Sequence, residues 1–274
     1  MSVTEKTSRS NVQIDSRAPV GAINERLGSV KVLSLEDADK AAVTLLQAFV
    51  EDSLSKLLLC HVSDRVLREK LEFELYRAYI KQHILKGICV GIGEAEDSFE
   101  TVGVWALPDS EDRGLDSFGT MMQSGFGKLW ENLDLKGRDK VFDGLLPLLH
   151  NTCEEIMLTD PRFLNKNVYT LVYLGSVARA RGKGNTRLMF EFMFKNYIDA
   201  EPDNITYLES SSAANLPIYE RFGFRSYREI ILGKKEDNYI EGIDYAVMNV
   251  MIRGPNGETW VTKNNDVLNS SSKL

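Results

Sequence analysis

A short basic segment of the chain combines glycines with positive charge and is suited to bind a phosphate. It reads Arg181-Gly182-Lys183-Gly184-Asn185-Thr186, follows an apolar run rich in β-branched residues and precedes a helical pattern. Glycine lets backbone N–H groups approach an anion closely, and a helix N-terminus adds unpaired N–H groups and partial positive charge. Arg181 and Lys183 add formal charge. The segment therefore predicts a pyrophosphate site.

Two widespread phosphate-binding patterns do not fit this segment. A Walker A loop requires GxxxxGK followed by Ser or Thr, but here Gly184 follows Gly182-Lys183. A dinucleotide fingerprint requires GxGxxG, but Thr186-Arg187 follows the two glycines in place of a third. Neither pattern explains the loop.

A third pattern fits. The segment resembles the pyrophosphate loop of the GCN5-related N-acetyltransferases (GNAT), Arg/Gln-x-x-Gly-x-Gly/Ala after a central strand, with Thr186 replacing the last Gly/Ala. A shifted frame, 179–184, matches all three positions. The first frame is preferred because it places residues 174–177 where the family's strand meets acetyl-pantetheine, although Ala178 then replaces a common proline. The resemblance assigns cofactor binding to Leu174, Gly175, Ser176, Val177, Arg181, Gly182, Lys183, Gly184, Asn185 and Thr186.

A second motif makes the resemblance specific. In the family, a strand leads into a helix that ends Tyr-x-x-x-Gly-Phe, and Tyr219 to Phe224 reproduces this ending after the strand that contains Leu208. The resemblance extends from about residue 167 to 252. It implies an acetyl-CoA-dependent N-acetyltransferase that works by direct transfer in a ternary complex, with Tyr219 protonating the leaving thiolate. The structural alternative for Tyr219 is a core aromatic residue of an amphipathic helix.

The general base is the less defined role. Glu209, at the end of its strand, is the carboxylate best placed to accept the amine proton, and a structural or substrate-orienting role is the alternative. An acidic loop at Asp109, Glu111 and Asp112 could face a cationic substrate, and Trp105 and Trp130 could wall a pocket. For these five side chains, solvation of the loop and ordinary packing are the default interpretations.

The elements that position these residues alternate between strands and helices, which predicts a mixed α/β sheet flanked by helices. Apolar periodicity predicts helices over residues 38–49, 64–83, 184–198 and 213–222, and strands over 30–35, 87–92, 101–107, 168–174, 205–209, 224–232 and 245–252. The polar turn 94–97 indicates a hairpin. Residues 109–165 predict a helical insertion before the central strand, part of it a looser helix or a mobile lid. The expected architecture is the GNAT fold.

This pattern predicts one GNAT domain over residues 26–253, a flexible polar arm over 1–25 and a polar tail over 254–274. The net charge of −7 excludes general affinity for nucleic acid or anionic lipid. No apolar run reaches the ~20 residues of a membrane span. The three histidines show no metal-ligand spacing, so we expect no metal.

The expected substrates and partners follow from the two motifs and the tail. The acceptor is expected to be a small-molecule amine, and the alternatives are a protein or peptide N-acetyltransferase or a catalytically idle acyl-CoA-binding regulator. The tail ends in Ser272-Lys273-Leu274, the tripeptide read by the peroxisomal import receptor, which predicts a peroxisomal location, with the cytoplasm as the alternative. The exposed strand edge at the C-terminal end is compatible with a homodimer.

Overall fold

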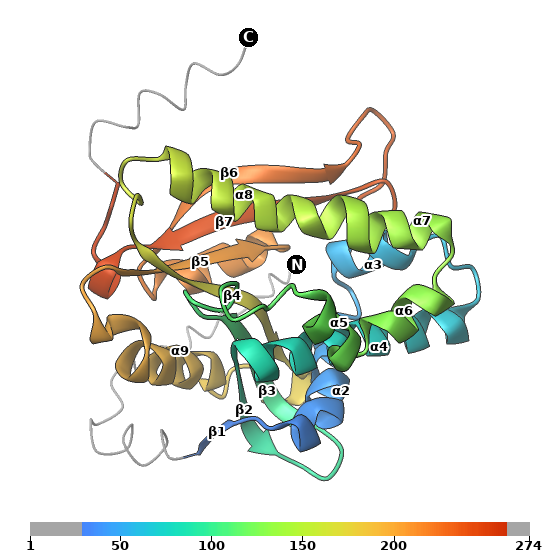
Figure 1. Cartoon of the computed structure of the whole chain (residues 1–274), viewed down its shortest axis with the longest axis horizontal. Helices are drawn as coiled ribbons and strands as arrows, with labels where there is room; N and C mark the ends of the chain where they lie inside the picture. Colours follow the sequence, from blue (N-terminus) through green and yellow to red (C-terminus); the bar gives the residue numbers. More distant parts are fainter. Residues whose placement is uncertain (1–28, 262–274) are drawn as a thin grey trace, which may run out of the picture.

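The computed structural model describes residues 29–261, and its centre is a seven-stranded sheet. The order is β1-β2-β3-β4-β5-β7-β6, and all neighbours pair antiparallel except β4 and β5, which pair parallel (Figure 1). The predicted mixed α/β fold is confirmed. The strands are β1 Val30–Val32, β2 Ile88–Glu94, β3 Phe99–Ala106, β4 Asn167–Ser176, β5 Asn204–Ser210, β6 Phe224–Gly233 and β7 Tyr245–Arg253.

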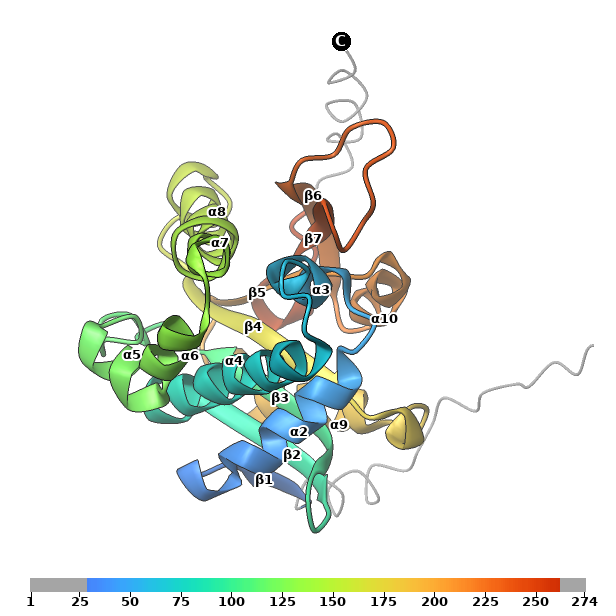
Figure 2. The same ribbon diagram turned by 90° about the vertical axis from the view of Figure 1, so that its right-hand side faces the viewer.

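Helices cover both faces of the sheet because each contributes an apolar stripe. Helices α2 (Ala38–Ala48) and α4 (Arg65–Lys86) pack on β2, β3 and β4, and α9 (Asn185–Asn196) packs on the opposite face with its buried residues Leu188, Met189 and Phe190. Figure 2 shows α2, α3 and α4 lying along one side of the sheet. The helix predicted over 213–222 begins as a 3₁₀ turn and continues as α10 (Leu216–Glu220).

One helix was not predicted from the sequence. Helix α3 (Ser53–Leu59) begins at Asp52, whose carboxylate accepts a hydrogen bond from the Ser55 backbone N–H at 2.9 Å. Its seven residues are too few to show a clear helical period, so the apolar run Leu57–Leu59 gave no usable signal. The helix packs against β7 and completes the wall of the cleft described below.

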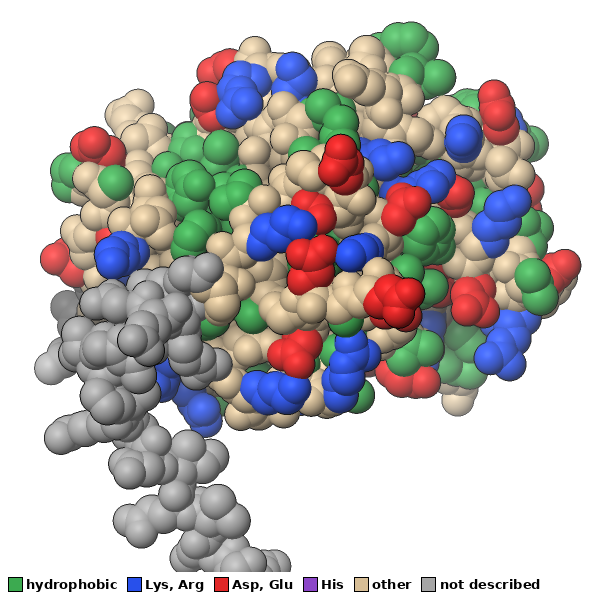
Figure 3. Space-filling view, turned by 90° about the horizontal axis from the view of Figure 1, so that it is seen from below, with side chains coloured by type: hydrophobic (Ala, Val, Ile, Leu, Met, Phe, Trp, Pro, Cys, Tyr) green, Lys and Arg blue, Asp and Glu red, His purple; other side chains and the backbone are tan. Residues whose placement is uncertain are grey.

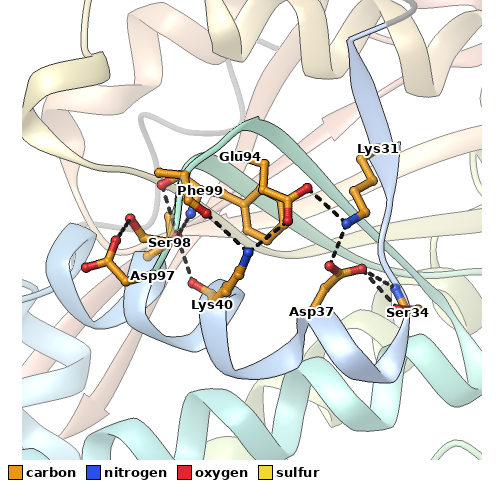
Figure 4. A network of polar contacts seen from close by, with 10 residues as sticks. Lys31, Ser34, Asp37, Lys40, Glu94, Asp97, Ser98 and Phe99 are labelled. Atoms are coloured by element: carbon orange, nitrogen blue, oxygen red, sulfur yellow. Dashed lines mark hydrogen bonds and ion pairs between the residues drawn. The ribbon is translucent and has the colours of Figure 1, made fainter.

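The predicted hairpin between β2 and β3 is confirmed, and an ion-pair network fixes its turn (Figure 4). Lys31 Nζ lies 2.6 Å from Asp37 Oδ1 and 3.0 Å from Glu94 Oε2, and Lys40 Nζ reaches Glu94 Oε1 at 2.9 Å. At the end of the same turn, Ser98 Oγ accepts a hydrogen bond from Arg179. The network therefore ties β1 and α2 to the hairpin that supports the loop after β4.

The insertion before β4 forms α5 (Phe118–Ser124), α6 (Phe126–Asn132), α7 (Leu135–Arg138) and α8 (Leu145–Thr159). A π-helical turn, Asp139–Gly144, precedes α8, where Pro147 lacks the N–H that a regular turn would use. Figure 1 shows α8 crossing β7 and β6, and Arg228 of β6 pairs with Glu155 of α8 at 2.8 Å.

Packing continues beyond Arg253, the predicted end of the domain. Trp260 Nε1 donates to the Ile252 carbonyl at 2.9 Å, and its ring centroid lies 5.3 Å from that of Phe163. The predicted arm over 1–25 and the Ser272-Lys273-Leu274 terminus lie outside the described residues. Within residues 29–261, none of the helices has the length and apolarity needed to cross a membrane.

Candidate active site

The sheet opens between β4 and β5, its only parallel pair in the described chain. Their ladder stops at Leu171 opposite Leu208, although β4 continues to Ser176 and β5 to Ser210. On the other side of β4, the register with β3 shifts. Tyr173 and Leu171 lie opposite two consecutive residues of β3, Val104 and Trp105, so Val172 has no partner there. The second half of β4 therefore leaves the edge that faces β5 unpaired.

A cleft of about 70 Å³ lies at this opening. Leu174 and Tyr219 line it on the α9 face, whereas Tyr76 and Met248 line it on the face covered by α3 and α4. The cleft therefore borders both faces of the sheet. The full lining is Phe49, Asp52, Leu54, Ser55, Leu58, Leu75, Tyr76, Leu171, Val172, Tyr173, Leu174, Leu208, Glu209, Ser210, Ser211, Asn215, Tyr219 and Met248.

The loop after β4 has the backbone that an anion site requires. Gly182 and Gly184 have φ of 83° and 81°, the left-handed region that favours glycine. Gly184 is the N-cap of α9 and no side chain caps the helix, so the first backbone N–H groups of α9 have no intrahelical partner. Arg181, Gly182 and Lys183 are exposed beside them. The loop therefore presents backbone donors and charge to solvent, as predicted for a pyrophosphate.

Two predicted loop residues have a partner that sequence reasoning missed. Lys183 Nζ lies 2.6 Å from Glu100 Oε1, and the buried Asn185 donates to Glu100 Oε2 at 3.1 Å. These contacts, led by the one with Lys183, lower the pKa of the Glu100 carboxyl. The carboxylate stands at the N-terminus of α9, where negative charge is favourable. No motif marks Glu100, because its position depends on the pairing of β3 with β4.

The strand residues predicted to contact the cofactor have different surroundings. Leu174 lines the cleft, and Ser176 Oγ lies 2.9 Å from Thr101 Oγ1. A side chain at Gly175 would meet Leu45 Cδ2 at 2.8 Å, so this glycine allows α2 to pack on β4. The Val177 N–H donates to the Glu100 carbonyl at 3.0 Å. The open backbone edge of β4 thus precedes Val177. Thr186 lies half-buried in the first turn of α9.

Glu209 lines the cleft near the end of β5, half-buried among apolar side chains. Burial raises the pKa of its carboxyl to about 7, against the opposing effect of a hydrogen bond from the Tyr207 hydroxyl at 2.5 Å. Cys153 of α8 interacts electrostatically with Glu209 from behind. A carboxyl with this pKa can accept a proton near neutral pH, which is what a general base requires.

Tyr219 lies in the same cleft, on α10. Its ring packs edge-on against Phe190 and Phe224, with centroids 6.2 and 5.9 Å away, so it also serves as a core aromatic. Burial raises the pKa of its hydroxyl to about 12, and the group stays protonated at neutral pH. The structure therefore brings Glu209, Tyr219 and Leu174 to one cleft.

The remaining candidates lie elsewhere. Trp105 is buried, with its ring centroid 5.9 Å from that of Phe190, and Trp130 is partly exposed on α6. Neither tryptophan lines the cleft, and neither does the acidic loop of Asp109, Glu111 and Asp112. The cleft is lined instead by Asp52, whose carboxylate accepts a hydrogen bond from the Ser211 hydroxyl just after β5. An aspartate before Ser-Leu-Ser-Lys is an N-cap signal, so the sequence contained a clue to this residue.

The surface and the acidic side chains give two further observations. On the face drawn in Figure 3, basic and acidic side chains are interspersed. Between Ser29 and Val261, no three His, Cys, Asp or Glu side chains are grouped so that they could hold a metal ion.

The chain is similar to known acetyltransferases in sequence and in fold. The chain is 30% identical over 231 residues to the Schizosaccharomyces pombe protein named uncharacterized N-acetyltransferase C550.08, and the match covers 84% of this chain and 85% of the relative. A crystal structure of histone acetyltransferase HPA2 and related acetyltransferase from Corynebacterium glutamicum matches with a TM-score of 0.51 at 18% identity, over 85% of this chain and 98% of that one. No family model matches. The chain belongs to the GCN5-related N-acetyltransferase superfamily and is an acyltransferase of that type.

Proposed function

We propose that the protein transfers the acetyl group of acetyl-CoA to a small-molecule amine within a ternary complex. The observation that carries this proposal is the cleft at the β4–β5 opening, which has Glu209 and Tyr219 in its wall. Members of the superfamily use acetyl-CoA. The pyrophosphate would lie on the loop at the start of α9, and the pantetheine amides would pair with the open edge of β4 beyond Leu171.

The chemistry needs one proton acceptor and one proton donor. Glu209 takes a proton from the ammonium, and the neutral nitrogen attacks the thioester carbonyl carbon to form a tetrahedral oxyanion. Backbone N–H groups on the open edge of β4 stabilise this oxyanion. The carbon–sulfur bond then breaks, and the leaving thiolate takes the Tyr219 hydroxyl proton. The protonated amide nitrogen gives up its extra proton, which restores the Tyr219 hydroxyl, and Glu209 releases the first proton to solvent.

Direct transfer is favoured over an acetyl-cysteine intermediate. Cys153 is the thiol near Glu209, and burial raises its pKa to about 12, so it stays protonated and weakly nucleophilic. It is also absent from the cleft lining. Sequential kinetics, with no CoA released before the amine binds, is the expected result.

Helix α8 favours a small acceptor. It covers the face of the sheet on which Tyr207 and Glu209 lie, through the Arg228–Glu155 and Tyr227–Asp160 contacts. With α3 on the same face, little open surface is left for an extended peptide near Glu209. A protein or peptide acceptor remains the alternative, and rapid turnover of peptides with none of small amines would establish it.

The proposal is tested by calorimetric titration with acetyl-CoA, ATP and NAD, followed by an amine screen. Acetyl-CoA is expected to bind with a micromolar Kd, and ATP and NAD are expected not to bind. Replacing Tyr219 with Phe should reduce kcat at least tenfold and leave the acetyl-CoA Kd within about twofold, because a general acid contributes to the chemical step. If no amine or peptide is acetylated and Tyr219→Phe changes nothing, the chain is an acyl-CoA-binding regulator.

We further propose a peroxisomal location, supported by the terminal Ser272-Lys273-Leu274. Fluorescent fusions with and without this tripeptide test the proposal. Loss of peroxisomal signal without it supports import through the receptor, and unchanged cytoplasmic signal contradicts it. A homodimer through the exposed edge of β6 is a separate proposal, which sedimentation tests.

A further inference from the structure

The acceptor side of the cleft is walled by apolar side chains from three elements. Leu54 and Leu58 come from α3, Leu75 from α4 and Met248 from β7. Leu58 and Met248 are only 2% and 3% exposed. This wall lies on the face of the sheet opposite α9, the side away from the predicted pyrophosphate loop.

Aromatic rings complete the wall and limit its movement. The Tyr173 ring meets those of Phe49 and Tyr76 edge-on, with centroids 5.7 and 5.5 Å away. Behind the wall, Phe126 and Leu129 of the insertion belong to the same hydrophobic cluster as Leu58 and Leu75. The apolar wall is therefore held in place from behind, which favours a compact hydrophobic group.

The charges of the cleft are of one sign. Within the described residues, its lining includes no Lys, Arg or His side chain, and it contains two carboxylates, Asp52 and Glu209. Asp52 Oδ1 accepts from the Ser55 N–H at 2.9 Å and the Ser55 hydroxyl at 3.2 Å, and Oδ2 accepts from the Ser211 hydroxyl. Glu209 is the carboxylate proposed to take the proton of the reacting amine.

From this arrangement we infer that the acceptor is a primary amine with an apolar or aromatic body and no carboxylate; the inference rests on the proposed function. An α-amino acid would place its carboxylate beside Glu209 with no cation to pair with it, which is unfavourable in a partly desolvated site. An arylalkyl or alkyl amine without a carboxylate avoids this penalty.

Matched acceptors test the inference on the wild-type protein. CoA release from acetyl-CoA is measured with phenethylamine and with phenylalanine. The expected kcat/KM, referred to the neutral amine, is at least about 100-fold higher for phenethylamine than for phenylalanine, the scale set by an unpaired charge in such a site. Equal or greater turnover of the amino acid overturns the inference.

A pair of variants locates the apolar body. Leu54→Phe fills the wall, and Leu135→Phe, at an 82% exposed position outside the cleft, is the control. Leu54→Phe should lower kcat/KM for phenethylamine at least tenfold and leave methylamine turnover and the acetyl-CoA Kd within about threefold, whereas Leu135→Phe should change none of them. An unchanged phenethylamine rate in folded Leu54→Phe contradicts the assignment. Failure to bind acetyl-CoA at all is a different result, and it removes the proposed function itself.

Discussion

Replacement of Glu209 with Gln should reduce activity and raise stability, and the two effects have one cause. The amide cannot accept the amine proton, so kcat/KM should fall about 10²–10⁴-fold, the range typical of general bases. Wild-type activity should increase with pH up to a plateau above about pH 7, the pKa to which burial raises this carboxyl. The variant should lack this acid limb.

The stability effect follows from the same raised pKa. Because the folded carboxyl holds its proton more tightly than the unfolded one, wild-type stability falls as pH rises from about 4.5 to 7 and stays lower above that range. The difference between these pKa values corresponds to an upper limit of about 3 kcal/mol. Solvent access to the half-buried group reduces this to about 1–2 kcal/mol. The amide of the variant stays neutral at every pH, so Glu209→Gln should gain that amount at pH 8 and almost nothing at pH 4.5.

Two assays separate these effects. Thermal unfolding at pH 8 should show a Tm about 2–6 °C higher for Glu209→Gln, with Glu96→Gln, in the turn between β2 and β3, as the matched control. Activity profiles use two amines of different pKa, because the substrate's own titration moves with the amine and that of Glu209 does not. A persistent acid limb near pH 7 in the variant, together with a Tm gain that is the same at pH 4.5 and 8, would refute both the base assignment and its burial.

Three further predictions concern the neighbours of these groups. Tyr207→Phe removes the hydrogen bond that favours the charged form of Glu209. Because a hydrogen bond to a charged group contributes about 1.5 kcal/mol, the acid limb of the pH–activity profile should move upward by about one pH unit. An unchanged acid limb would show that Tyr207 does not position the carboxylate. Glu100→Gln removes a negative charge beside the predicted pyrophosphate site and should tighten acetyl-CoA binding by roughly threefold to tenfold, about 1 kcal/mol. This gain in affinity should disappear at about 0.5–1 M salt, where screening acts over a few ångströms. Weaker binding would mean that Glu100 mainly orients Lys183. Gly184→Glu places a carboxylate at a left-handed position on the start of α9 and should abolish acetyl-CoA binding in calorimetry, whereas Gly119→Glu, exposed on α5, should leave it intact.

The sequence predicted the parts of the fold whose signals are local. Strands β4 and β5 and helix α9 carry long apolar patterns, and the loop at Gly182 and Gly184 needs a left-handed backbone that glycine provides. These elements appeared close to their predicted bounds. Glu209 was identified because it lies at the end of β5, and Tyr219 was identified from the Tyr-x-x-x-Gly-Phe ending; the fold brings them to one cleft.

The residues that were missed are those whose positions depend on distant pairing. Glu100 reaches the loop because β3 pairs with β4, with Thr101 opposite Ser176. Asp52 reaches Ser211 across 159 residues of sequence. The Val177 N–H donates to the Glu100 carbonyl, again through the β3–β4 pairing. A hydrophobic period along one strand contains no information on which residue of another strand lies beside it.

The helical insertion shows why the motifs alone do not define the acceptor. It was considered as a lid, but its residues do not line the cleft; Phe126 and Leu129 pack behind the wall made by Leu58 and Leu75, and α8 closes the sheet behind Glu209. In the proposed function, the loop at α9 and Tyr219 act on the acetyl donor. The apolar wall proposed for the acceptor side comes largely from α3, which the insertion supports from behind. A change of the insertion that left the loop intact would therefore alter which amine is acetylated and leave acetyl-CoA binding unchanged.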